Sequence, residues 1–458
     1  MAIATINPAT GETVRTFTAL DDEQVEAKLA VAARAAREYP ATTFAQRADW
    51  LRRTADLLDA EADETAAMMT LEMGKTLAAA QAEVHKCATA CRFYADNAES
   101  MLTDEPADAE AVGARRAFAT YQPLGVVLAV MPWNFPLWQA VRFIAPAMMA
   151  GNVGLLKHAS NVPQCALYLE DVLARAGFPD GVFQTLLIGS GQVERVLRDP
   201  RVAAATLTGS EPAGRSVGGV AGGELKKVVL ELGGSDPFLV LPSADLERAA
   251  KVATTARAQN NGQSCIAAKR FIVHTDVYDR FTELFVQRMS SLVIGDPTDE
   301  RTDVGPLATE QGRADLETQV DDAVKLGATV LCGGARLDGP GWFYPPTVIT
   351  GITPEMRLYS EEAFGPVASL YRAGSLDEAL EIANTTTFGL GSNVWTTDAD
   401  EQRRCVRDLA AGAVFVNGMT TSYPQLPFGG IKNSGHGREL SAHGPREFCN
   451  VKTVWIGD

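Results

Sequence analysis

The chain has 458 residues, 46% of them hydrophobic and 21% charged, and it carries a formal net charge of −16. This composition is typical of a globular protein of roughly two to four domains and excludes wholesale disorder. The acidity excludes sequence-independent binding to nucleic acid, which needs clustered lysines and arginines. It does not exclude an anionic small substrate, because one arginine can bind a carboxylate inside an acidic protein.

No signal points to a membrane or to secretion. The most apolar stretch, residues 123–156, is interrupted by Asn134, Pro136 and Arg142, and residues 1–12 lack a basic region followed by an apolar one. The seven cysteines are scattered and odd in number, a pattern typical of reduced thiols. We therefore expect a cytoplasmic protein with no membrane partner.

The N-terminal hundred or so residues are predicted to be helical. Asp21 can cap a helix over residues 24–37, and amphipathic periodicity continues over 44–58 and 77–94. Residues 104–112 are acidic and contain a proline, which indicates a linker or an exposed turn.

From residue 123 onward, short apolar runs alternate with segments of helical spacing, which is typical of parallel α/β structure. The first series has expected strands at residues 126–131, 153–156, 183–188, 203–208, 228–230 and 238–241, and expected helices at 163–176 and 212–220. A second alternating series comprises residues 249–260, 271–274, 281–292, 328–332, 367–371, 376–384, 392–395 and 413–416. Two α/β units are therefore predicted to meet near Gly233.

Cys265 ends a glycine-containing turn, residues 260–265, before the expected strand 270–274. A cysteine on such a turn can face a cleft and be activated by backbone dipoles, so it is a candidate nucleophile. A buried structural thiol is the alternative, because cysteine is among the most buried residue types.

Two other polar residues follow apolar strands. Glu231 ends a strand before two glycines, where partial desolvation would raise its pKa toward that of a general base. The alternative is a solvated acid at a strand end. Asn134 lies within Pro-Trp-Asn-Phe-Pro, and its amide could donate to an oxyanion or form an Asx turn between aromatic anchors.

The signals for phosphate binding are weaker. The segment 189–194 has Glu194 where a dinucleotide fingerprint needs glycine or alanine. The segment 209–216 nearly spells a Walker A loop, but Arg215 replaces its lysine and Pro212 removes a backbone amide. A helix N-terminus beneath a dinucleotide pyrophosphate explains these residues better than an NTPase does.

Metal binding is not predicted. His85, Cys87 and Cys91 lie close in sequence, but His85 and Cys87 fall on opposed faces of a helix and no paired set stands elsewhere. Two core thiols on one helix is the better interpretation.

Taken together, these segments resemble the aldehyde dehydrogenase superfamily nearly from end to end. The motifs that carry the resemblance are, in order, residues 5–12, 132–136, 207–210, 231–234, 261–265, 361–366 and 427–435. The resemblance implies an α/β, aldehyde dehydrogenase-like fold with a Rossmann-like cofactor domain, an α/β catalytic domain and a small β oligomerisation arm. By this resemblance the cofactor domain comprises residues 1–106 and 124–232, the catalytic domain residues 233–430, and the arm residues 107–123 and 448–458. Such an arm implies a homodimer or homotetramer.

The resemblance also implies a mechanism for an aldehyde substrate. Cys265 as thiolate would attack the aldehyde carbon, and the Asn134 side chain and the Cys265 backbone N–H would hold the oxyanion of the thiohemiacetal. Hydride transfer to a nicotinamide would leave a thioester, which Glu231 would hydrolyse by activating water.

The cofactor is expected to be NADP rather than NAD, although NAD is possible. Ser160 stands where NAD-preferring relatives carry an acid, so no charge there repels a 2′-phosphate, and Lys157 adds an attractive one. The implied cofactor-binding residues are Trp133, Lys157, Ser160, Gly209, Ser210, Glu231, Leu232, Glu362 and Phe364.

Within the superfamily the chain is most similar to the succinate-semialdehyde dehydrogenases. By that resemblance Arg142, eight residues after Asn134, would bind the far carboxylate of the substrate, and Ser422 could add a hydroxyl donor. Gln259 departs from the pattern, because many of these enzymes have a second arginine there. For Arg142 the alternative is a surface or interdomain salt bridge.

The sequence is also compatible with two other functions. One is a broad-specificity aldehyde dehydrogenase for neutral aldehydes or other omega-semialdehydes. The other is a non-catalytic binding protein with this fold, which the joint presence of Cys265, Glu231 and Asn134 disfavours.

Overall fold

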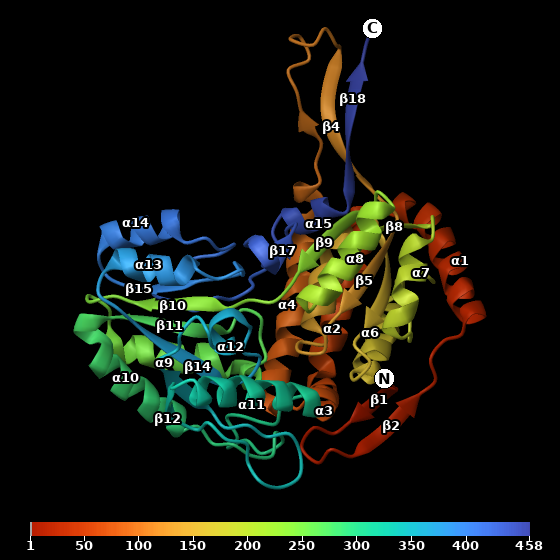
Figure 1. Ribbon diagram of the computed structural model, residues 1–458. Helices are drawn as coiled ribbons and strands as arrows, with labels where there is room; N and C mark the ends of the chain where they lie inside the picture. Colours follow the sequence, from red (N-terminus) through yellow and green to blue (C-terminus); the bar gives the residue numbers. More distant parts are fainter. Residues whose placement is uncertain (1) are drawn as a thin grey trace.

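The computed structural model describes residues 2–458, and within them the chain forms four β-sheets, of which the two large ones are flanked by helices (Figure 1). Two sheets are large and mainly parallel, one of six strands and one of seven. The mixed α/β class expected from the sequence is therefore confirmed. No helix in this part of the chain is long and apolar enough to cross a membrane.

The N-terminal region is mostly helical. Its elements are β1 (Ile3–Ile6), β2 (Thr13–Phe17), α1 (Asp22–Glu38), η1 (Tyr39–Ala41), α2 (Phe44–Ala60), α3 (Ala62–Met73) and α4 (Leu77–Met101). The three predicted helices correspond to α1, α2 and α4, and the Asp21 side chain caps α1 by accepting from the Gln24 N–H at 2.8 Å. The β1–β2 hairpin and α3 were not predicted, because β2 is mostly exposed and α3 buries Thr and Glu side chains among its apolar ones.

The six-stranded sheet has the order β17-β9-β8-β5-β6-β7, and all its pairs are parallel except β17 with β9. Its elements are β5 (Val126–Met131), α5 (Trp138–Met149), β6 (Val153–His158), α6 (Pro163–Ala176), β7 (Phe183–Thr185), η2 (Ser190–Gln192), α7 (Val193–Arg198), β8 (Val202–Thr208), α8 (Glu211–Gly223), β9 (Lys227–Glu231) and, from far downstream, β17 (Gly435–His436). Of the six strands predicted in the first series, five are in this sheet, and the sixth, residues 238–241, corresponds to β10 of the other large sheet. Helix α5 is buried at every residue and lacks an amphipathic face, so helical periodicity did not reveal it.

The seven-stranded sheet has the order β12-β13-β14-β11-β10-β15-β16 and is parallel except for β12 with β13. Its elements are β10 (Asp236–Val240), α9 (Leu246–Ala258), η3 (Gln259–Gly262), β11 (Ala268–His274), α10 (Thr275–Ser290), α11 (Glu310–Lys325), β12 (Thr329–Cys332), β13 (Thr347–Thr350), α12 (Arg357–Ser360), β14 (Val367–Ala373), α13 (Leu376–Asn384), β15 (Asn393–Trp395), α14 (Ala399–Asp408) and β16 (Phe415–Val416). Helices α11 and α14 and strand β13 were not predicted.

After β16 the chain returns to the first sheet. It passes through η4 (Lys432–Ser434) and adds β17 to the edge of β9, pairing Gly435 with Glu231. A Cβ on Gly435 would overlap the Leu230 carbonyl, and its φ of +112° also favours glycine. This pairing brings the residues around 430–440 against the end of β9.

A third sheet extends away from the body of the molecule (Figure 1). It is antiparallel, in the order β18-β4-β3, and consists of β3 (Glu105–Pro106), β4 (Arg116–Pro123) and β18 (Cys449–Ile456), which follows α15 (His443–Glu447). The two segments expected to form an oligomerisation arm thus pair with each other along eight residues, from Cys449 with Pro123 to Ile456 with Arg116.

Candidate active site

The carboxyl ends of the parallel strands in the first sheet carry most of the predicted polar residues. Glu231 ends β9, Lys157 lies near the end of β6, Gly209 and Ser210 follow β8, and Asn134 follows β5. Ligands bind at such an edge in open α/β sheets. These residues therefore lie together at one edge of the first sheet.

A cavity of about 280 Å³ opens at this edge, between the two large sheets. It is lined by Pro132, Trp133, Asn134, Thr208, Gly209, Ser210, Leu232, Gly233, Cys265, Glu362 and Phe364. Eight of the predicted site residues therefore share one cavity, while Lys157, Ser160, Glu231, Arg142 and Ser422 lie outside its lining.

The loop that carries Cys265 has an unusual backbone. Asn260, Asn261 and Gly262 have φ values of +54°, +56° and +74°, three left-handed residues in succession. Asparagine and glycine tolerate this region better than other residues do. A Cβ on Gly262 would overlap the backbone of Gly365 and Pro366, so close packing also requires glycine there.

Side-chain amides hold this loop in place. The Asn261 Nδ2 donates to the carbonyls of Gly74 at 2.8 Å and Pro306 at 2.9 Å, and the Asn260 Nδ2 donates to the Asn134 carbonyl at 2.8 Å. These residues are buried, so their lost hydrogen bonds could not be replaced by water. The position of Cys265 is consequently fixed before any ligand arrives.

A buried lysine lies behind the nucleophile. The Lys269 Nζ donates to the carbonyls of Ser264 at 2.8 Å and Cys265 at 2.7 Å, and it pairs with the Glu362 carboxylate at 3.1 Å. Burial raises the pKa of the Cys265 thiol to about 12, while the charges of Arg142 and Lys269 act to lower it. The thiol therefore depends on neighbouring cations for its acidity.

The Asn134 amide faces the same cavity as Cys265. Its Nδ2 donates to the Gln263 carbonyl at 3.2 Å, and its Oδ1 has no hydrogen-bond partner in the described part of the chain. A primary amide has two donor hydrogens, so one remains for an oxyanion formed at Cys265.

Glu231 is fully enclosed and lies beside a second acid. Neither of its carboxylate oxygens has a hydrogen-bond partner among residues 2–458, and burial and the nearby Glu439 carboxylate raise its pKa well above the usual value. A Cβ on Gly429 would lie 2.8 Å from its Oε1, so the carboxyl packs toward the returning C-terminal segment.

Arg142 is already engaged by protein groups. Its Nε pairs with the Glu439 Oε2, its Nη2 donates to the Thr208 hydroxyl at 3.2 Å, and its guanidinium lies 4.6 Å from the centroid of the Phe428 ring. The side chain is 2% exposed. These contacts weigh against the expected role of Arg142 as the carboxylate ligand and agree with the salt-bridge alternative, although the partner is buried rather than at the surface.

Ser422 is buried, and it accepts hydrogen bonds from one cationic and one aromatic side chain. Its Oγ accepts from the Lys86 Nζ at 2.8 Å and from the Trp138 Nε1 at 3.0 Å. Lys86 comes from α4, far away in the sequence.

The cofactor end of the cavity is aromatic on one side and polar on the other. The rings of Trp133 and Phe364 meet edge to face with centroids 5.7 Å apart. The Glu362 Oε1 accepts from the Gly234 N–H at 3.1 Å, and a Cβ on Gly233 would lie 2.5 Å from its Oε2. Glycine at position 233 thus leaves room for the acid at the cavity wall.

The residues at this end fit a phosphorylated dinucleotide. Helix α8 begins directly after Ser210, and its N-terminal N–H groups can bind a pyrophosphate. Lys157 is buried, and no carboxylate in the described residues lies within ion-pair distance of it. Burial alone lowers its pKa, so the ammonium is an open partner for an anion. Arg215 instead pairs with Glu211 on the helix surface, which removes the Walker A interpretation.

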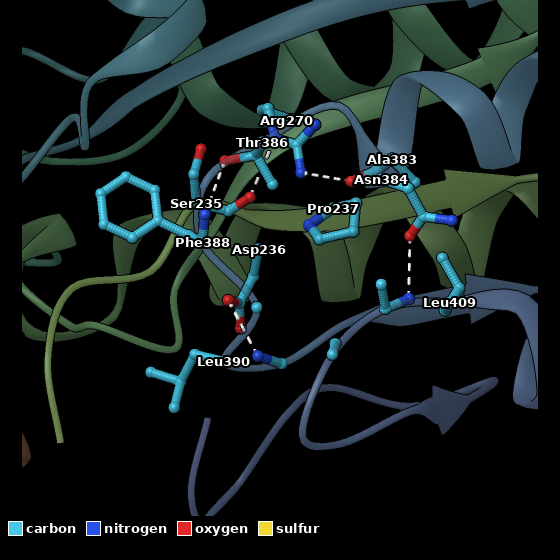
Figure 2. A pocket seen from close by; sticks show the side chains of 14 residues that line it. Ser235, Asp236, Pro237, Arg270, Ala383, Asn384, Thr386, Phe388, Leu390 and Leu409 are labelled. Carbon is cyan, nitrogen blue, oxygen red and sulfur yellow. Dashed lines mark hydrogen bonds between the residues drawn. The ribbon is translucent and has the colours of Figure 1, made fainter. Parts of the chain in front are cut away.

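A second, much smaller void lies behind the amino end of β11 (Figure 2). Its volume is about 10 Å³, room for about one water molecule. Arg270 donates to the carbonyls of Ser235 at 2.9 Å and Ala383 at 2.8 Å, and the Asp236 Oδ1 accepts from the Gly391 N–H at 3.0 Å. These groups hold the second sheet together rather than form a ligand site.

Sequence reasoning missed three functional candidates, Lys86, Lys269 and Glu439. Lys269 carried a usable signal, because a lysine next to Arg270 at the start of an apolar strand is unusual. Glu439 and Lys86 carried none, since their importance comes from residues far away in the chain.

Comparison with known proteins agrees with this geometry. A model of the aldehyde dehydrogenase family matches residues 1–454. The chain is 71% identical over 456 residues to a protein of Mycobacterium tuberculosis named succinate-semialdehyde dehydrogenase [NADP(+)] 1, covering 100% of both. It is 70% identical to a protein of Mycobacterium avium named succinate-semialdehyde dehydrogenase [NADP(+)], covering 97% of that protein. Succinic semialdehyde dehydrogenase from Streptococcus pyogenes, solved with NADP+, superposes with a TM-score of 0.97 at 38% identity and full coverage of both chains.

Proposed function

Because the chain belongs to the aldehyde dehydrogenase family, we propose that it oxidises succinate semialdehyde to succinate with NADP as hydride acceptor. The observation that carries this proposal is the shared cavity of Cys265, Asn134 and Glu362, together with high identity to relatives named for this activity. An aldehyde dehydrogenase needs a nucleophile, an oxyanion donor and a water-activating base, and all three types are present.

Cys265 as thiolate attacks the aldehyde carbon. The Asn134 amide and the Cys265 backbone N–H stabilise the resulting oxyanion. NADP, when bound, accepts the hydride that leaves the thiohemiacetal carbon. The product of this step on the protein is a thioester at Cys265.

Glu231 then takes a proton from water, which attacks the thioester and releases the acid. Its carboxyl packs toward Gly429 and lies outside the cavity lining, so this step requires the side chain to turn toward Cys265. Burial and the Glu439 carboxylate raise the pKa of Glu231, which makes the carboxylate a stronger base than an exposed glutamate.

The cofactor is proposed to be held along the edge of the first sheet. Glu362 would bind the nicotinamide ribose, Trp133, Leu232 and Phe364 would pack around the ring, and Gly209 and Ser210 would hold the pyrophosphate. Lys157 and Ser160 would select the 2′-phosphate. In this scheme residues 1–106 and 124–232 form the cofactor domain and residues 233–430 the catalytic domain.

We also propose that the arm, residues 107–123 and 448–458, mediates assembly into a homodimer or homotetramer. Val451 and Trp455 on β18 are 59% and 56% exposed, an unusual exposure for large apolar side chains. Substituting Trp455→Glu should lower the molar mass measured by sedimentation. The cytoplasmic location, supported by the scattered cysteines, stays a prediction.

The direct test of the activity is the absorbance of reduced cofactor with a panel of aldehydes. We expect kcat/KM for succinate semialdehyde with NADP to exceed that for butanal, which has the same carbon chain without the carboxylate. Equal values for the two aldehydes would favour the broad-specificity alternative. The absence of reduction with every aldehyde would favour a binding protein.

A further inference from the structure

Lys86 is a cation without an acidic partner. Its side chain is partly buried on α4, and no carboxylate of residues 2–458 lies within ion-pair distance of its ammonium. Glu83, one helical turn earlier, is occupied: it pairs with Lys75 and accepts from the N–H groups of Leu137 and Trp138 at 2.9 Å. A buried charge without a counter-charge is costly unless a ligand supplies one.

The surroundings of Lys86 present hydrogen-bond donors rather than acceptors. The Ser422 Oγ accepts from both Lys86 and Trp138, which uses its two lone pairs. Its own O–H then needs an acceptor, and no protein acceptor for it is found among residues 2–458. The ammonium donates one of its three hydrogens to Ser422, so further donors remain. A group that only accepts hydrogen bonds, such as a carboxylate, matches this set.

The Lys86 ammonium lies beside the segment that leads from the oxyanion donor into α5. It is 4.3 Å from the centroid of the Trp138 ring, and Trp138 is the first residue of α5, four residues after Asn134. Burial and the Arg142 charge lower the pKa of Lys86, while Cys87, Glu83 and Cys265 act to raise it. A carboxylate bound at Lys86 would therefore lie beside the segment that carries Asn134.

We propose that Lys86, together with the Ser422 hydroxyl, binds the distal carboxylate of the semialdehyde and is the residue that selects an acidic substrate. This inference rests on the proposed function. It differs from the sequence expectation, in which Arg142 has this role, because Arg142 is held by Glu439 and Thr208 while Lys86 has no counter-ion. An approaching carboxylate would have to displace Glu439 from Arg142, but it meets no competitor at Lys86.

The test compares Lys86→Met, which keeps the length of the side chain and removes the charge, with the wild type on two aldehydes. We expect Lys86→Met to raise KM for succinate semialdehyde by about 10- to 100-fold, the loss of a charge-assisted hydrogen bond, and to leave kcat/KM for butanal within about twofold. Lys86→Arg should retain most of the selectivity. Lys251→Met, on the exposed side of α9, is the matched control and should change neither value.

A second measurement does not use the acidic aldehyde. Succinate should inhibit butanal oxidation competitively, and its inhibition constant should rise by a similar factor in Lys86→Met and in Ser422→Ala. If circular dichroism shows that Lys86→Met is unfolded, the other two variants test the proposal. Ser422→Ala should raise the inhibition constant of succinate, and Lys86→Arg should leave it close to the wild-type value; an unchanged constant in Ser422→Ala would contradict the proposal.

The two proposals fail differently. A wild type that does not prefer succinate semialdehyde to butanal overturns the proposed function and this inference with it. The role of Lys86 alone is overturned if the wild type prefers succinate semialdehyde but Lys86→Met keeps its kcat/KM for both aldehydes, or loses it equally for both.

Discussion

Arg142 and Glu439 form an ion pair in the protein interior, where their side chains are 2% and 4% exposed. The pair joins α5 to the segment that follows β17, and it stands beside Glu231. Its two members therefore affect both the stability of the fold and the charge state of the base.

Removing one partner should be costly. We expect Arg142→Met to lower the free energy of unfolding by about 3 kcal/mol, because Glu439 is left as an unpaired buried charge. The double variant Arg142→Met with Glu439→Gln should recover part of this loss, as measured by urea denaturation. If Arg142→Met instead folds normally and raises KM for succinate semialdehyde alone, the role expected from the sequence is restored.

Glu439 should set the pH at which the base works. Its negative charge raises the pKa of Glu231, and Glu231 acts only when ionised, so activity should increase with pH through this raised pKa. Glu439→Gln removes the charge and should move the rising limb of kcat to lower pH. The profile of kcat against pH with butanal reports the shift, and an unchanged profile would show that the two acids are not coupled in catalysis.

Lys269 should control the acidity of the nucleophile. Its ammonium acts to lower the pKa of Cys265 and donates to the Cys265 carbonyl. We expect Lys269→Met to move the pH dependence of Cys265 alkylation by iodoacetamide upward by about one unit or more. The Cys265→Ala variant gives the alkylation of the other six thiols, which is subtracted. Lys269→Met should also raise KM for the cofactor, since Glu362 loses its ion-pair partner; an unaltered alkylation profile would rule out the electrostatic role.

Cofactor choice should depend on the charge at position 160. Ser160→Glu introduces an acid that repels a 2′-phosphate and can bond both ribose hydroxyls, so the ratio of kcat/KM for NADP to that for NAD should fall by about 10-fold or more. Lys157→Met should weaken NADP more than NAD. Steady-state rates with each cofactor at saturating aldehyde check both predictions, and Ser160→Ala is the control that should keep the NADP preference.

The parts of the fold with clear periodicity could be predicted from the sequence, and the parts without it could not. Strand β5 and helix α6 agree with the predicted bounds, because one is a short apolar run and the other has a regular apolar face. Helix α5 has no polar face and β2 has no buried one, so neither carries the pattern that identifies its class.

The same distinction applies to the site. Cys265, Glu231 and Asn134 stand in short local motifs, so the sequence alone makes them candidates. The spacing of Arg142 from Asn134 could not show that the Glu439 carboxylate pairs with it in the folded chain. Lys86 and Ser422 are 336 residues apart, so their contact is a property of the folded chain.

The pairing of β17 with β9 has a consequence for protein synthesis. A ribosome completes Cys265, Asn134 and Glu231 well before it reaches Gly429, which packs against the Glu231 carboxyl, and Glu439. The nascent chain thus holds its nucleophile while its base still lacks a finished environment. Loss of the segment after residue 430 should therefore abolish hydrolysis of the thioester even though every catalytic side chain is present.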